Sequence, residues 1–258
     1  MDAKIIAGIL AAGGAALAAG GVYRMNKKTG YFKKGNSVRY DVSRIPFKKT
    51  SPLKGKTVVF LGSSVTKGFA AHNSAFAEYI AKKDSCICIK EAVNGTTLID
   101  NCEDSYIERM RDNLDPERQV DLFICQLSTN DATRNSPLGE ISESRDLDSF
   151  DVKTVCGAIE YIIAYAKETW HCRVMFYTNP QYDSDTYAKM VEALLKIQEK
   201  WQIGVIDFWN DERINSISPE KRKLYLQDPI HPMKAGYAEW LVPVMEQRIA
   251  EYLETQVS

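Results

Sequence analysis

The chain has 258 residues, of which 45% are hydrophobic and 26% are charged. This composition is typical of one sizeable folded domain and excludes a largely disordered protein. The net charge is −1 and the isoelectric point is about 6.3, so we expect no binding to nucleic acid. The spacing of the six cysteines suggests no zinc site and no disulfide framework, although their even number leaves a secreted, disulfide-bridged form as an alternative.

The first predicted element is an N-terminal hydrophobic helix within residues 1–23. The run from Ile5 to Tyr23 contains nineteen residues and no charge, and as a helix it would extend roughly 28 Å, enough to cross a hydrocarbon core. We therefore expect a single-pass anchor in the cell membrane. Two alternatives stay open: a signal peptide cleaved near Ala16-Leu17-Ala18, and a buried helix rich in alanine and glycine.

A strongly basic neck follows the hydrophobic run. From Arg24 to Lys56 there are eleven lysines and arginines and one acid, Asp41, whereas residues 57–258 carry a net charge of −11. Residues 24–55 are predicted to be a linker or arm that lies on the body or on the membrane surface. Because cations resist translocation, a cytoplasmic body is slightly favoured over an extracellular one.

The remainder, residues 56–258, is predicted to be one folded domain. Short apolar runs typical of β-strands alternate with segments whose apolar residues recur at the spacing of an α-helix. Runs that are apolar on both faces and separated by helices indicate a parallel sheet covered on both sides, so we expect a three-layer, doubly wound, flavodoxin-like α/β sandwich with five strands. The predicted strands are 57–62, 87–93, 121–127, 173–179 and 203–209; the predicted helices are 73–83, 101–113, 152–169, 185–201 and 234–254.

In such a fold, ligands bind at the carboxyl ends of the strands. The first strand ends in Gly62-Ser63-Ser64-Val65-Thr66-Lys67-Gly68. This is no phosphate-binding loop, because Lys67 precedes the second glycine and five residues separate the glycines. It is also an incomplete G-x-S-x-G nucleophile elbow, since Thr66 replaces the second glycine. Ser64 can still act as a nucleophile if a base lies within reach.

The best candidate for that base is His231. Asp228 precedes it by three residues in a loop held by two prolines, so its carboxylate can bond one imidazole nitrogen while the other faces outward. A purely structural Asp-x-x-His loop is the alternative. His171 is expected to cap or pack at a helix end, and His72 has no carboxylate near it in the sequence.

Two residues at strand ends are candidate oxyanion donors. Gly95 follows the second strand and can expose its backbone N–H, and Asn130 follows the third strand and offers a carboxamide. Each has a simpler explanation, as a common Asn-Gly turn or as part of a helix cap.

Together, these blocks resemble the SGNH hydrolases, the GDSL esterase/lipase family, over residues 56–253. The resemblance implies a catalytic triad, an oxyanion hole that also uses the Ser64 N–H, and no metal or cofactor. Two positions depart from the family pattern, because Ser63 replaces the usual Asp and Ser128 the usual Gly. The matching blocks are Gly62-Ser63-Ser64, Asn94-Gly95, Ser128-Thr129-Asn130-Asp131 and Asp228-Pro229-Ile230-His231.

By this resemblance the protein is a serine esterase that works through an acyl-serine intermediate. Residues 132–151 are long and polar and are expected to overhang the pocket, where Arg134 or Arg145 is a candidate contact for an anionic substrate; solvated loop charges are the alternative. A polar segment over the pocket favours a substrate that is an ester of a small acyl or acetyl group with a polar or carbohydrate alcohol. A lysophospholipase or other lipid esterase, and an inactive membrane-bound binding or scaffold protein, remain alternatives.

Overall fold

The computed structural model describes residue 21 and residues 24–255. The predicted N-terminal hydrophobic helix, residues 1–23, therefore lies outside the described residues except for Gly21. In the part of the chain that is described, no helix combines the length and the apolar character needed to cross a membrane.

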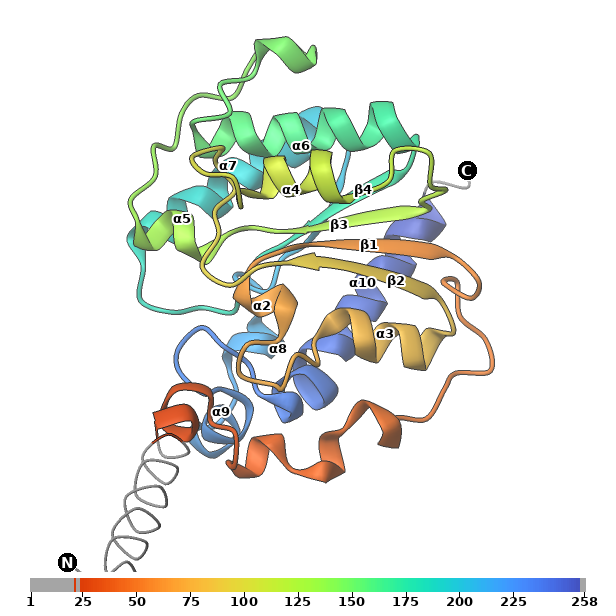
Figure 1. Cartoon of the computed structure of the whole chain (residues 1–258), viewed down its shortest axis with the longest axis vertical. Helices are drawn as coiled ribbons and strands as arrows, with labels where there is room; N and C mark the ends of the chain where they lie inside the picture. Colours follow the sequence, from red (N-terminus) through yellow and green to blue (C-terminus); the bar gives the residue numbers. More distant parts are fainter. Residues whose placement is uncertain (1–20, 22–23, 256–258) are drawn as a thin grey trace, which may run out of the picture.

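A five-stranded parallel sheet forms the centre of the molecule (Figure 1). The strand order is β2-β1-β3-β4-β5, the flavodoxin-like order, so the predicted sheet is confirmed. β1 reads TVVFLG and is buried from its second residue onward, which explains why its apolar run lacks the alternation of a half-exposed strand. The strands are β1 (Thr57–Gly62), β2 (Ile87–Ala92), β3 (Leu122–Gln126), β4 (Arg173–Tyr177) and β5 (Gly204–Ile206).

Helices cover both faces of this sheet and bury two separate cores. Successive residues of β1 enter opposite cores: Val59 packs with α4, α6 and α7, and Val58 packs with α3 and α10. The helices of the first face are α4 (Tyr106–Asn113), α5 (Thr129–Thr133), α6 (Val155–Trp170) and α7 (Asp185–Trp201). Those of the second are α2 (Ser64–Lys67), α3 (Phe76–Asp84), α8 (Glu212–Asn215), α9 (Pro219–Tyr225) and α10 (Val242–Thr255), which is preceded by the π-helical segment η5 (Gly236–Leu241).

Residues 24–55, here called the arm, run along the outside of the second face, from beside α9 to the start of β1 (Figure 1). After helical residues 24–29 they form three short 3-10 helices. Tyr40 and Leu53 are buried, and the Tyr79 hydroxyl on α3 donates to the Tyr40 carbonyl at 2.6 Å. The arm is therefore packed on the body. Its 3-10 helices are η1 (Lys34–Asn36), η2 (Val38–Tyr40) and η3 (Val42–Arg44).

Only the first part of the polar segment 132–151, with Arg134 on the Gly95 carbonyl, lies at the strand ends, so the prediction that this segment overhangs the pocket is wrong for the rest. Its middle part, which includes η4 (Leu147–Ser149), lies along α6 and α7. The buried Glu160 on α6 accepts from the Ser142 N–H at 2.8 Å, and the Lys200 ammonium at the end of α7 donates to the Ser142 and Ser144 carbonyls at 2.6 Å. These bonds hold the middle of the segment against α6 and α7.

Candidate active site

The predicted site residues meet at the carboxyl ends of the strands. Ser64 follows β1, Gly95 follows β2, and Asn130 follows β3. Asp228 and His231 come from the loop between α9 and η5. Because parallel strands end at one edge of the sheet, residues far apart in sequence come together there.

The turn that carries Ser64 is held by Gln126, the last residue of β3. The Gln126 Oε1 accepts from the Ser63 and Thr66 backbone N–H groups at 3.0 and 3.2 Å and from the Thr66 hydroxyl at 2.8 Å. Gly62 permits this close packing, because a Cβ there would overlap the Thr66 hydroxyl oxygen. Ser64 consequently stands at the start of α2 in a fixed position.

A chain of hydrogen bonds joins the three residues predicted to form the triad. The Ser64 Oγ lies 2.8 Å from the His231 Nε2, and the His231 Nδ1 lies 2.8 and 3.0 Å from the two carboxylate oxygens of Asp228. Because a carboxylate only accepts, Nδ1 must carry the ring proton. Nε2 then accepts from the Ser64 hydroxyl and is placed to take its proton.

The Asp228 carboxylate is kept ionised by its surroundings. Its burial acts to raise the pKa, but the hydrogen bond and charge of His231, with the N–H groups of Ile230 and His231 itself, outweigh burial and hold the pKa below its ordinary value. Those two N–H groups each donate to Oδ1 at 2.9 Å. The loop therefore fixes the carboxylate that orients the imidazole.

Gly95 and Asn130, the two predicted donors, lie beside the Ser63-Ser64 turn. Gly95 has φ of +80°, and a Cβ there would meet no described atom within 4 Å, so its backbone borders open space. The Asn130 Nδ2 donates to the Thr96 carbonyl at 2.9 Å and to the Ser63 Oγ at 3.2 Å. Since the Thr96 carbonyl only accepts, the amide nitrogen, and not its oxygen, faces the turn.

Arg134, the candidate substrate contact, binds the protein instead. Its Nη2 donates to the Gly95 carbonyl at 2.7 Å, so this guanidinium fixes the glycine turn. Arg145 is remote from the site, since its Nη2 donates to the Lys200 carbonyl at the end of α7. His171 caps the end of α6 as predicted, and the His72 ring stacks on Tyr31 at 3.8 Å.

Two buried charged residues support the site; the sequence reasoning named Asp131 only as part of a matching block and missed Arg109. Asp131 accepts from the Leu98 and Ile99 N–H groups at 2.7 and 3.4 Å, which anchors the loop after Gly95; burial outweighs these bonds and raises the pKa of Asp131. Arg109 on α4 donates to the Gly62 carbonyl at 2.9 Å and to the Thr96 hydroxyl at 3.1 Å. Arg109 thus links the nucleophile turn to the glycine loop. The signal that could have identified Arg109 is its charge on the apolar, buried face of the predicted helix 101–113.

The arm also contacts the site, and this too was missed. Asn36 is buried; its Nδ2 donates to the Ala70 carbonyl at 2.8 Å, and its Oδ1 accepts from the Lys234 N–H at 3.0 Å. Ala70 follows the nucleophile helix, and Lys234 follows the His231 loop. In addition, the side chain of Gln227, next to Asp228, donates to the Lys27 carbonyl at 2.9 Å. The arm therefore joins the two segments that carry Ser64 and the Asp228–His231 pair.

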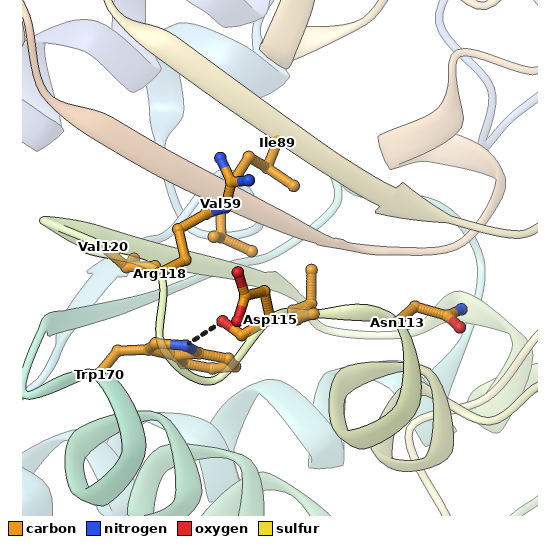
Figure 2. Close-up of a pocket in the computed structure, with 8 residues that line it drawn as sticks. Val59, Ile89, Asn113, Asp115, Arg118, Val120 and Trp170 are labelled. Atoms are coloured by element: carbon orange, nitrogen blue, oxygen red, sulfur yellow. Dashed lines mark hydrogen bonds between the residues drawn. The ribbon is translucent and has the colours of Figure 1, made fainter.

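Two cavities among the described residues can be compared with the position of Ser64. Figure 2 shows a cavity of about 200 Å³ whose wall includes Val59, Arg118 and Trp170. These residues stand toward the amino-terminal ends of the strands, away from Ser64. A hollow of about 220 Å³ beside α9 is lined by Asp228 and Leu226, but Ser64 and His231 are not part of its wall.

Comparisons of the fold find similar solved structures. A protein from Lactobacillus plantarum superposes with a TM-score of 0.62 at 16% identity, over 79% of this chain and 98% of the other. A GDSL-like protein from Bacteroides ovatus gives 0.55 at 15% identity, over 79% and 100%. A family two carbohydrate esterase from Clostridium thermocellum, in complex with cellohexaose, gives 0.54 at 13% identity, over 82% and 67%. At these identities the likeness concerns the fold alone.

The sequence comparison identifies the family. No curated protein matches the chain. The sequence model of the GDSL-like lipase/acylhydrolase family, however, matches residues 60–239, a range that contains all the predicted site residues. The chain therefore belongs to the GDSL-like lipase/acylhydrolase family and is a serine ester hydrolase.

Proposed function

We propose that Ser64 is the nucleophile, His231 the general base and acid, and Asp228 the orienting carboxylate of this hydrolase. The observation that carries the proposal is the hydrogen-bonded chain from the Ser64 Oγ through both imidazole nitrogens to the carboxylate, with contacts of 2.8 Å on each side of the ring. His231 takes the hydroxyl proton as Ser64 attacks the ester carbonyl, and returns it to the departing alcohol. Water then releases the acyl group from the serine.

The oxyanion in this proposal is bound by the N–H groups of Ser64 and Gly95 and by the Asn130 carboxamide. The amide of Asn130 keeps its bond to the Thr96 carbonyl, and its second N–H, which faces the Ser63 Oγ at 3.2 Å, is shared with the oxyanion. Arg134 holds the Gly95 carbonyl, so the donors are fixed before the substrate arrives. Fixed donors of this kind stabilise the transition state without the cost of reorganisation.

The favoured substrate is an ester of a small acyl group, such as acetyl, with a polar or carbohydrate alcohol. The middle of the polar segment 132–151 is tied to α6 and α7 and supplies no cover for a long acyl chain. The similar fold of a carbohydrate esterase from Clostridium thermocellum supports the same choice.

A lipid ester is the second candidate, and one specific observation favours it. The arm, which contacts the Asp228 loop through Gln227 and Lys27, carries an exposed Phe32 side chain close to that contact. An apolar surface beside a catalytic loop suits a substrate that is presented at a lipid interface.

The test is a panel of soluble acetyl and longer acyl esters, acetylated sugars and lysophospholipids. Ser64→Ala should abolish both hydrolysis and labelling by a fluorophosphonate, because it removes the nucleophilic oxygen. Ser63→Ala is the matched control, since it removes the adjacent hydroxyl, and it should still label. Undiminished turnover by Ser64→Ala would refute the assignment, and a wild-type protein that never labels would be a scaffold.

A further inference from the structure

The outer surface of the arm is unusually apolar. Among the residues that the structure describes, seven large hydrophobic side chains are exposed, and five of these belong to the arm. Phe47 is 67% exposed, and Phe32 and Val38 are each 63% exposed. Single exposed apolar residues are common, but a concentration of them in one segment indicates an interaction surface. The other two members in the arm are Met25 and Tyr31.

The same surface carries positive charge that the body does not neutralise. The arm has ten lysines and arginines, and within the described range only Arg39 and Lys48 of these form ion pairs. The single acid, Asp41, pairs with Lys234. Eight cations therefore remain unpaired within the described residues: Arg24, Lys27, Lys28, Lys33, Lys34, Arg44, Lys49 and Lys54.

The arm presents these groups outward because its inner side is fastened to the body. Tyr40, Leu53 and Asn36 are buried against it, while the arm forms the outer boundary of the molecule from α9 to β1 (Figure 1). In the sequence, the arm directly follows the nineteen-residue uncharged run that ends at Tyr23. The body itself carries a net charge of −11 over residues 57–258.

We propose that the outer surface of the arm docks on an anionic lipid surface. Unpaired lysines beside exposed aromatic rings are the side chains that bind phospholipid headgroups and enter the headgroup region. The charge separation favours one orientation, because an anionic surface attracts the arm and repels the body. Docking brings the Asp228–His231 loop close to the lipid, since Gln227 binds the Lys27 carbonyl. The proposal does not depend on which ester the site cleaves.

The test uses the full chain with Phe47→Trp and vesicles that contain bromine-labelled acyl chains, which quench tryptophan on contact. One vesicle type is phosphatidylcholine alone, and the other adds an equal amount of phosphatidylglycerol. We expect the added tryptophan to be quenched in the anionic vesicles and not in the neutral ones. Leu138→Trp is the control, because Leu138 is exposed in the segment that lies along α6 and α7, and it should stay unquenched in both.

A matched pair of charge variants tests the role of the cations. In the arm, Lys34, Arg44 and Lys49 are replaced by Gln; on the body, Arg118, Lys189 and Lys196 are replaced by Gln, so each variant loses three positive charges. The arm variant should lose the Phe47→Trp quenching, and the body variant should keep it. Both should hydrolyse a soluble ester at the wild-type rate without vesicles, which shows that the fold is intact. Quenching that is absent in both vesicle types, equal in both, or equal for the two charge variants would overturn the proposal.

Discussion

The Ser63 hydroxyl lies between an acceptor and a donor, 3.4 Å from the Gln126 Oε1 and 3.2 Å from the Asn130 Nδ2. A hydroxyl can donate to the first and accept from the second at once. A carboxylate, the usual side chain at this family position, only accepts, so it would oppose the Gln126 oxygen in a fully buried place. The departure from the family pattern at Ser63 thus fits the presence of Gln126 at the end of β3.

Replacement of Asn130 tests the proposed oxyanion donor. Asn130→Ala should lower turnover of a soluble ester by on the order of 10²–10³, as expected for one lost donor in an oxyanion hole. Ser63→Ala removes the hydroxyl that bonds Gln126 and Asn130 but leaves Asn130 held by the Thr96 carbonyl, so its loss in turnover should be less than about tenfold. The measurement is kcat for both variants beside the wild type; equal losses would place the main effect in the turn and not in the donor.

The lowered pKa of Asp228 predicts a pH-dependent contribution to stability. A carboxyl group whose pKa is lower in the folded state stabilises the fold above its ordinary value, 3.8, and this contribution is lost as the pH falls through the lower folded pKa. Asp228→Asn should therefore unfold at lower urea concentration than the wild type at neutral pH. The difference between their urea midpoints should shrink below about pH 4. A difference that stays constant from neutral to acidic pH would show that charge is not its cause.

At the scale of elements, the arm acts on the site through Asn36. Besides its bonds to Ala70 and Lys234, this amide donates to the Gly30 carbonyl at 2.9 Å, so one buried side chain ties the arm to both segments that carry the triad. Asn36→Ala leaves the Gly30 and Ala70 carbonyls and the Lys234 N–H without this partner. Each buried polar group left unsatisfied costs about 1–3 kcal/mol of folding stability. The free energy of unfolding should fall accordingly.

The same variant should also slow catalysis. A shift of the His231 loop relative to α2 lengthens the 2.8 Å contact between the Ser64 Oγ and the imidazole, so kcat should fall by about tenfold to 10²-fold while KM changes little. Asn26→Ala is the control, because Asn26 lies in the arm but its side chain only accepts from the Phe32 N–H. A less stable Asn36→Ala protein with normal kcat would limit the arm to supporting the fold.

For the molecule as a whole, the sheet could be predicted because its strands are short apolar runs whose character does not depend on the rest of the chain. All five strands lie within or match their predicted ranges, and α7 has its predicted bounds. The arm's 3-10 helices have no hydrophobic period to detect. At the carboxyl end, the predicted helix 234–254 begins with the π-helical segment η5, which periodicity does not distinguish from an α-helix.

The candidate site also has a part that could be predicted from the sequence and a part that could not. Ser64, Gly95, Asn130, Asp228 and His231 could be placed together because each follows a strand or lies in a distinctive loop, and the structure does bring them to one edge of the sheet. The supporting contacts could not be foreseen, because they join residues far apart in the chain whose partners only the fold defines. Gln126 is 60 residues from Thr66, and the position of Arg134 on the Gly95 carbonyl depends on two loop conformations.

The attachment of the arm has a consequence for where this enzyme begins. A boundary drawn at Lys56, where the regular strands and helices start, would cut away Asn36 and leave the Lys234 N–H and the Ala70 carbonyl without that partner. Shortening the chain to this boundary would thus remove a buried contact that joins α2 and the His231 loop through the arm. A chain that keeps these contacts extends upstream at least to Lys27, whose carbonyl receives the Gln227 amide.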